Sequence, residues 1–117
     1  MRPEGRDASY LWDMVDAART AQELVAGYDV HRYLSDRTVR FAIERLVEIV
    51  GEAARRLSEA FRTAHPEIPW RRIIGQRHVL AHDYGEIDHD RIWELVTDFL
   101  PELLAALEPL LPPTPEE

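Results

Sequence analysis

Apolar residues recur at steps of three and four along most of this chain, the spacing that gathers them on one face of an α-helix. The first stripe predicts a helix that ends close to Gly27. A second stripe, nearly heptad in spacing, predicts one helix from about Asp36 to His65, roughly 45 Å long at the usual rise per residue. Ser35 or Asp36 can cap this second helix. The stripes comprise Leu11, Met14, Val15, Ala18, Ala21, Leu24 and Val25, and then Val39, Ile43, Leu46, Val50, Ala53, Leu57 and Phe61.

Prolines interrupt the pattern after the long helix. Pro66 and Pro69 should stop it, because proline lacks the backbone N–H that a helix interior needs. A short third helix is then expected from about Trp70 to His82, followed by a turn at Gly85.

A fourth helix is expected to begin at Asp88, whose carboxylate can cap the first turn. Ile87 and Ile92 are placed to form a hydrophobic staple across that cap. Pro101 should kink the helix or start a fresh helical segment. The apolar positions of this helix are Ile92, Trp93, Val96, Phe99, Leu100, Leu103, Leu104, Leu107 and Leu110.

These elements predict an all-α fold, an antiparallel bundle of four or five helices. No strand pattern, internal repeat or second domain is visible in the sequence. We therefore expect residues 1–111 to form a single helical domain and residues 112–117 to form a disordered C-terminal tail. The second apolar stripe is wide enough to face one neighbour within the chain and another across a homodimer.

Charge and composition narrow the possible partners. With 22 acidic residues against 14 basic ones and a net charge of −8, the chain will not attract nucleic acid over its whole surface, so any RNA contact must be focused. The absence of cysteine excludes disulfides and thiolate metal sites. The charged N-terminus has no apolar signal core, and no apolar window is long enough to span a membrane, so a cytoplasmic protein is expected.

The densest candidate chemistry lies between Arg77 and Tyr84. Arg77 can hold a phosphate in its planar fork, and His82 can transfer a proton near neutral pH. Tyr84 offers a hydroxyl that can bind a phosphate or accept one. The stretch from Pro69 to His82 adds two further arginines and no acid. A local cationic island on an acidic protein points to a phosphate site.

RNA cleavage without a metal needs a base for the 2′-hydroxyl proton, an acid for the leaving 5′-oxygen and a cation for the charged phosphorane between those steps. One imidazole cannot conveniently be both base and acid, whereas two copies of His82 in a symmetric dimer can. Arg77 and His82 lie about 140° apart around an ideal helix, so they converge only where the helix ends or across two chains. An arginine and a histidine at a helix C-terminus are also favoured by the helix dipole alone.

Two other groups of side chains allow alternative sites. His78 and His82 are four residues apart and, with Asp83 or His89, would suit a divalent metal ion. The second helix also carries an acidic face, which is either a solvated surface or the source of a carboxylate that orients the site's cation. This face comprises Glu44, Glu48, Glu52 and Glu59. We take His78, Glu48 and Glu52 as supporting residues and expect neither a metal ion nor a cofactor in the site.

At these residues the chain resembles a known family. Arg77, His82 and Tyr84 match the R-x4-H-x-Y signature of HepT-like proteins in the HEPN superfamily. The resemblance extends over nearly the whole chain and includes Gly51-Glu52-Ala53, Ile68-Pro69-Trp70 and the Ile87-Asp88…Ile92-Trp93 start of the fourth helix.

The resemblance implies a function. Proteins of this kind are all-helical homodimers that act as toxins in HEPN/MNT type VII toxin–antitoxin systems and cleave RNA without a metal ion. By that resemblance, Arg77 would stabilise the scissile phosphate and His82 would be the acid/base in a cleft between two chains. A nucleotidyltransferase antitoxin would transfer AMP from ATP to Tyr84, and the added charge and bulk would exclude RNA.

The position after the signature arginine is commonly asparagine in the family and is His78 here. This change either adds a second imidazole to the site or weakens the enzyme. The alternative function is therefore a catalytically weak helical binding module that docks a nucleotidyltransferase partner.

Overall fold

The computed structural model describes residues 5–76 and 87–112 of the chain. Within these ranges the backbone is helical apart from short connections and contains no strand, which confirms the predicted all-α fold. The elements are α1 (Gly5–Leu24), α2 (Val30–Ser35), α3 (Arg37–Arg56), α4 (Glu59–Ala64), α5 (Trp70–Gly75), α7 (His89–Glu94), the π-helical turn η1 (Leu95–Phe99), α8 (Leu100–Leu107) and the 3₁₀ turn η2 (Glu108–Leu110).

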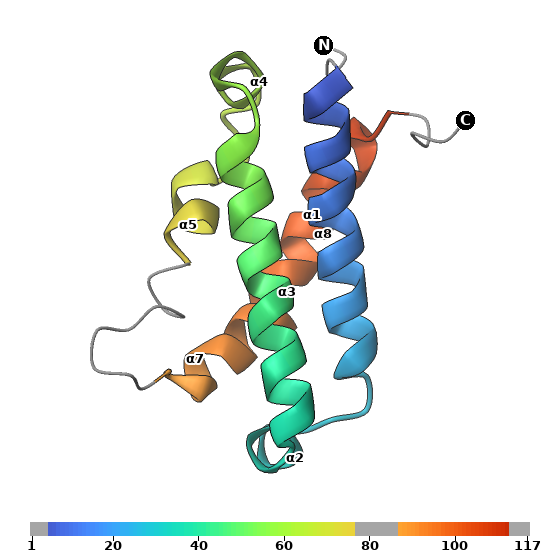
Figure 1. Ribbon diagram of the computed structural model, residues 1–117, viewed down its shortest axis with the longest axis vertical. Helices are drawn as coiled ribbons and strands as arrows, with labels where there is room; N and C mark the ends of the chain where they lie inside the picture. Colours follow the sequence, from blue (N-terminus) through green and yellow to red (C-terminus); the bar gives the residue numbers. More distant parts are fainter. Residues whose placement is uncertain (1–4, 77–86, 113–117) are drawn as a thin grey trace.

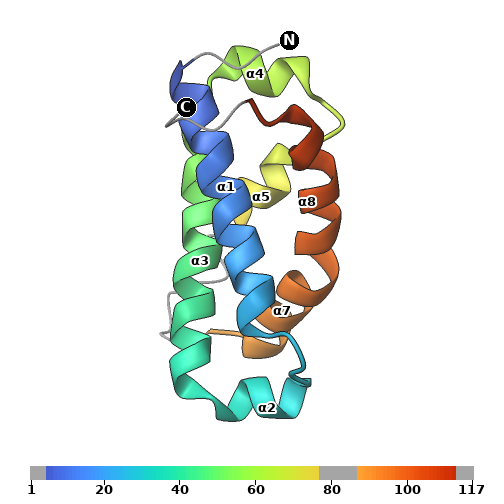
Figure 2. The same cartoon turned by 90° about the vertical axis from the view of Figure 1, so that its right-hand side faces the viewer.

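The long helices α1 and α3 lie antiparallel and form the centre of the bundle (Figure 1). Helices α5 and α7 lie on the side of α3 that faces away from α1, and α8 passes obliquely behind the central pair. Figure 2 shows α2 and α4 closing opposite ends of the bundle. The described part of the chain has no helix that is both long and apolar enough to cross a bilayer.

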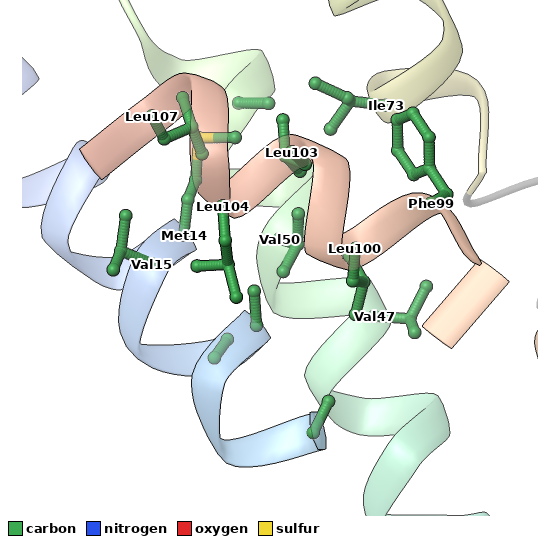
Figure 3. Packing of buried hydrophobic residues seen from close by; sticks show 14 of the residues in the cluster. Met14, Val15, Val47, Val50, Ile73, Phe99, Leu100, Leu103, Leu104 and Leu107 are labelled. Atoms are coloured by element: carbon green, nitrogen blue, oxygen red, sulfur yellow. The ribbon is translucent and has the colours of Figure 1, made fainter. Parts of the chain in front are cut away.

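One hydrophobic core joins these helices. Met14 and Val15 of α1, Val47 and Val50 of α3 and the leucines of α8 meet there (Figure 3). Both predicted stripes face this core: most of their residues are buried, and Leu24, Val39 and Leu46 are partly buried at its edge. The helical periodicity therefore identified the core correctly.

The single helix predicted from Asp36 to His65 is wrong, because the chain breaks at Leu57. There the backbone becomes extended, with φ −58° and ψ 145°, and Ser58 starts α4 by accepting a hydrogen bond from the Phe61 N–H at 3.1 Å. Asp7 of α1 fixes the break, since its carboxylate accepts from the Ser58 N–H at 2.8 Å and from the Ser58 hydroxyl at 2.7 Å. Leu57 and Phe61 stay buried on both sides of the break, so the apolar spacing gave no sign of it.

The short helix α2 was not predicted. Asp29 caps it by accepting from the Arg32 N–H at 2.8 Å, and Tyr33 is its buried anchor. Of the two proposed caps for α3, Asp36 is the N-cap: it accepts from the Val39 N–H at 3.1 Å and from the Tyr28 hydroxyl at 2.7 Å.

The start of α7 follows the prediction. Asp88 accepts from the Arg91 N–H at 3.1 Å, Ile92 is buried, and Ile87 packs against the core, as a capped helix with a hydrophobic staple requires. Of the third helix predicted from Trp70 to His82, α5 (Trp70–Gly75) is described, and the predicted positions from 77 to 82 lie outside the described residues.

Pro101 produces a fresh helical segment, as expected, through a π-helical turn. Proline has no N–H to donate to the Thr97 carbonyl, and its ring would clash with that carbonyl in a regular helix. The preceding turn widens, so that the Leu100 N–H bonds to the Leu95 carbonyl five residues earlier. Helix α8 then begins at Leu100. Of the predicted tail, residues 113–117 lie outside the described chain.

Candidate functional site

The predicted signature residues Arg77, His78, His82 and Tyr84 lie outside the described residues. Their roles therefore remain predictions, and the structure defines the frame on either side of them. Gln76 ends α5 on one side, and Ile87 leads into α7 on the other. Both helices lie against the same side of α3 (Figure 1).

Gln76 is a buried polar residue at the end of this frame. Its exposed fraction is 6%, and its side-chain Oε1 is buried without a hydrogen-bond partner among the described residues. Its backbone N–H bonds to the Ile73 and Ile74 carbonyls, so the residue is held by the last turn of α5. A buried acceptor without a donor is uncommon in folded proteins.

A cavity of about 510 Å³ opens beside Gln76, between α5 and the α7–η1 segment. The guanidinium carbon of Arg72 lies 4.0 Å from the centre of the Phe99 ring, so a cation–π contact holds this side chain at the cavity wall. Figure 3 shows the Phe99 ring beside Ile73, inside the core. The cavity is lined by Arg72, Gly75, Gln76, Arg91, Glu94, Leu95 and Asp98.

The fold separates Arg71 from Arg72, two arginines of the predicted cationic island. Arg71, the neighbour of Arg72, lines a different cavity with Trp70 and residues of α4. The two adjacent arginines therefore serve two separate surfaces, and the charge that the sequence places together is not all available at one site.

A second polar cluster joins α3 to the start of α7. Nη1 of Arg40 lies 3.0 Å from Nε2 of His89, and Nδ1 of His89 lies 3.6 Å from Oε2 of Glu44. The side chains of His89 and Glu44 are 29% and 16% exposed, so the cluster is largely buried. Arg40 Nε, Glu44 Oε2 and His89 Nδ1 are buried without a hydrogen-bond partner in the described part of the chain.

Tyr33 belongs to the same region. Burial raises the pKa of the Tyr33 phenol, and the nearby Glu44 carboxylate raises it further. The ring centre lies 5.2 Å from that of Trp93 on α7, and the hydroxyl is buried without a described partner. A neutral phenol is therefore expected beside the carboxylate across the physiological pH range.

The predicted supporting acids Glu48 and Glu52 lie together on α3, along a cavity of about 480 Å³ that α3 shares with α1. Glu48 pairs with Arg45, and Glu52 pairs with Arg55 at 2.6 Å and with Arg56 at 2.9 Å. Glu44, one turn earlier on the same helix, is the acid that faces the start of α7.

Of the residues proposed for the alternative metal site, one lies within the described chain. His89, the proposed additional ligand, contacts Arg40 and faces Glu44, and His78, His82 and Asp83 lie outside the described residues. Over residues 5–76 and 87–112, no three histidine, aspartate or glutamate side chains gather in a way that suits a metal ion.

Sequence reasoning missed the Arg40–Glu44–His89 cluster. It treated Glu44 as part of an acidic face and His89 as a possible metal ligand. The available signal was that Arg40 and Glu44 are four residues apart, which places them on one face of α3. The sequence did not show that α7 would lie against that face.

Comparison with known proteins gives the family. The family model described as "Ribonuclease HepT-like" matches residues 14–110. The protein of Thermococcus cleftensis named "Probable ribonuclease HepT" is 34% identical over 101 residues, which cover 86% of this chain and 92% of the relative. A "Putative RNase" of Methanocaldococcus jannaschii is 30% identical over 100 residues, again 86% of this chain and 92% of the relative. No solved structure matches significantly. The chain therefore belongs to the ribonuclease HepT-like family.

Proposed function

We propose that this protein is the toxin of a toxin–antitoxin system and that it is a metal-independent endoribonuclease. The observation that carries the proposal is that the family match over residues 14–110 includes the whole Arg77-x4-His82-x-Tyr84 signature. The curated relatives named as ribonucleases align with most of this chain, which supports the same activity here.

The proposed reaction needs no cofactor. One imidazole removes the 2′-hydroxyl proton, and the 2′-oxygen attacks the adjacent phosphorus. Arg77 stabilises the negative charge of the phosphorane with its planar fork. A second imidazole donates a proton to the 5′-oxygen as the P–O5′ bond breaks. The products are a 2′,3′-cyclic phosphate and a 5′-hydroxyl.

Two copies of the chain supply the two imidazoles. His82 of one protomer acts as the base while His82 of its partner acts as the acid, so the active unit is a homodimer.

Regulation would occur at Tyr84. The phenol oxygen attacks the α-phosphorus of ATP, pyrophosphate leaves, and an AMP group is joined to the tyrosine. The donor enzyme is a nucleotidyltransferase antitoxin. The new phosphodiester brings negative charge into a cleft for RNA phosphate and excludes the substrate.

The test is cleavage of a defined RNA by the purified protein in EDTA, with analysis of the product ends. Wild type should produce 2′,3′-cyclic phosphate and 5′-hydroxyl ends, and His82→Ala should be inactive. His31→Ala is the matched control, because His31 is an exposed histidine on α2, and this variant should keep full activity.

The other outcomes identify other functions. If wild type and His82→Ala are equally inert while a nucleotidyltransferase still binds, the protein is a binding module. If EDTA abolishes cleavage and a metal ion restores it, the protein is a metal-dependent hydrolase that uses His78 and His82. A mass increase of whole AMP units on Tyr84, after reaction with the partner and ATP, would support the regulatory step, and its absence would contradict it.

A further inference from the structure

We propose that the cavity beside Gln76 binds a nucleobase, with guanine preferred, and so gives the enzyme a base preference next to its cleavage site. The relevance to RNA cleavage rests on the proposed function, but the binding itself does not. The site is built by α5 and the α7–η1 segment within the described chain.

Arg72 provides the surface on which a base can stack. Its guanidinium lies 4.0 Å over the ring of Phe99, which is only 4% exposed and is therefore held in the core. The residue itself is exposed and lines the cavity, so its guanidinium plane is both anchored and accessible. Guanidinium planes are common stacking partners for unpaired bases in RNA-binding proteins.

Gln76 provides a buried acceptor. Its Oε1 is shielded from solvent, has no described donor, and belongs to a residue that lines the cavity. Because Oε1 is shielded, a base can reach it only after the Gln76 amide turns toward the cavity. There a base edge that carries N–H groups would satisfy this oxygen, whereas a phosphate group, which offers only acceptors at neutral pH, would not.

Two carboxylates extend the set of acceptors. Glu94 and Asp98 line the same cavity, one turn apart, and neither forms an ion pair within residues 5–76 and 87–112. Their negative charges offset the positive charges of Arg72 and Arg91 in the described lining, so the cavity has no net positive charge to hold an RNA phosphate. The two carboxylates match the neighbouring N1–H and N2–H2 donors of guanine, whereas the hydrogen-bonding edge of uracil has a single N–H.

The π-helical turn η1 assembles these groups. Leu95 and Asp98 of this turn line the cavity, and the ring of Phe99, in the same turn, contacts the guanidinium of Arg72. The cavity volume of about 510 Å³ also lies within the range of roughly 300–1,000 Å³ that is usual for small-molecule sites.

The site is adjacent to the proposed nuclease signature in the chain. Gln76 immediately precedes Arg77 in the sequence. A base bound at Gln76 would therefore belong to a nucleotide close to the phosphate that Arg77 is proposed to hold.

The test is calorimetric titration of the full-length protein with the 5′-monophosphates of guanosine, adenosine, cytidine and uridine, and with ribose 5-phosphate as a probe that has no base. Guanosine monophosphate should bind at least tenfold more tightly than uridine monophosphate, and ribose 5-phosphate should bind most weakly. Equal affinity for all five compounds would overturn the proposal, because it would indicate binding through the phosphate alone.

Variants separate stacking from charge. Arg72→Lys keeps the charge but removes the plane, and it should weaken guanosine monophosphate binding about tenfold, as does loss of a stacking side chain in single-strand binding. Arg71→Ala is the matched control, because the adjacent arginine lines the other cavity, and it should bind like wild type. Equal losses in both variants would overturn the proposal.

Gln76→Leu should reduce the preference for guanosine over uridine monophosphate, because it replaces the buried acceptor with an apolar side chain that is one atom shorter. Gln76→Glu retains an acceptor oxygen and should retain the preference, which keeps the test valid if the leucine variant does not fold. A guanine preference unchanged in a folded Gln76→Leu protein would contradict the proposed acceptor.

The two proposals fail separately. If RNA is cleaved in EDTA but no nucleotide binds with base preference, the cavity proposal is wrong and the nuclease proposal stands. If guanosine monophosphate binds selectively but no RNA is cleaved, the nuclease proposal is wrong and the cavity is a nucleotide site with another role.

Discussion

The Nε2 atom of His89 lies 3.0 Å from Nη1 of Arg40, and this contact determines which ring nitrogen carries the proton. A guanidinium only donates hydrogen bonds, so Nε2 must accept and must be unprotonated. The proton of the neutral ring is then on Nδ1, which faces the Glu44 carboxylate at 3.6 Å. An arginine and a glutamate on one face of α3 thus orient a histidine at the start of α7.

The first prediction is that the His89 ring carries its proton on Nδ1 and leaves Nε2 as the acceptor for Arg40. Long-range ¹H–¹⁵N NMR spectra distinguish the two ring nitrogens, and Nε2 should show the shift of an unprotonated acceptor. In Arg40→Leu the donor is absent, so the tautomers should become mixed, while exposed His31 should be unchanged and serves as the control. A proton found on Nε2 in the wild type would contradict this reading of the contact.

The second prediction concerns the break between α3 and α4. Ser58→Ala removes the N-cap of α4 and the hydroxyl that donates to Asp7, and it should lower the free energy of unfolding by about 1 kcal/mol. Asp7→Ala should cost about 2 kcal/mol, because it leaves the Ser58 N–H without its charged acceptor.

Urea unfolding monitored by circular dichroism measures both effects. Ser35→Ala is the control, because its hydroxyl donates to the Arg32 carbonyl at the exposed end of α2. This variant should stay within about 0.5 kcal/mol of wild type. A Ser58→Ala protein as stable as Ser35→Ala would show that the cap does not hold the break.

The elements that sequence reasoning found are those whose signals are local. Helix periodicity located the core-facing residues of α1 and α3, and Asp88 with Ile87 and Ile92 defined the start of α7. The break at Leu57 was missed because it depends on Asp7, 51 residues away from Ser58 in the sequence. No pattern near Ser58 reveals that partner.

In the candidate site, too, sequence reasoning found the local signal and missed the long-range contacts. The signature could be read from residues 77–84 because its spacing is short and fixed. The contact of Arg72 with Phe99 and that of Arg40 with His89 join residues 27 and 49 positions apart. They depend on how α5 and α7 pack against their neighbours, which local spacing does not encode.

The third prediction uses the pH dependence of stability at Asp36. The hydrogen bond from the Val39 N–H is the main cause that holds the pKa of this carboxyl below its usual value, and the hydrogen bond from the Tyr28 hydroxyl is the second cause. Because the pKa is lower in the folded state, the ionised carboxylate stabilises the folded protein at pH values above the unfolded-state pKa of about 3.9. This stabilisation is lost as the pH falls through the folded-state pKa.

Asp36→Asn tests this linkage, because asparagine can still cap α3 but carries no charge. The variant should unfold at a lower urea concentration than wild type at pH 7, and the difference should shrink below about pH 4. A difference that stays constant from pH 7 to pH 2.5 would exclude the charge as its cause.

The fourth prediction concerns Arg77 and follows from the proposed nuclease function. Arg77→Lys keeps the positive charge but loses the fork that matches two phosphate oxygens. We expect kcat/KM for RNA cleavage to fall about a hundredfold, the usual effect of removing one donor to a developing anion. Near wild-type rates would show that Arg77 acts only through its charge.

The fifth prediction is a bell-shaped dependence of kcat/KM on pH in EDTA. Two His82 side chains in opposite protonation states are required at once, so activity should fall both when the base becomes protonated in acid and when the acid loses its proton in alkali. Mixing wild type with inactive His82→Ala should form heterodimers that retain only one imidazole, and these should be far less active than half of the wild-type rate. A single sigmoidal pH profile, or heterodimers with half activity, would mean that one imidazole suffices and that each protomer cleaves RNA on its own.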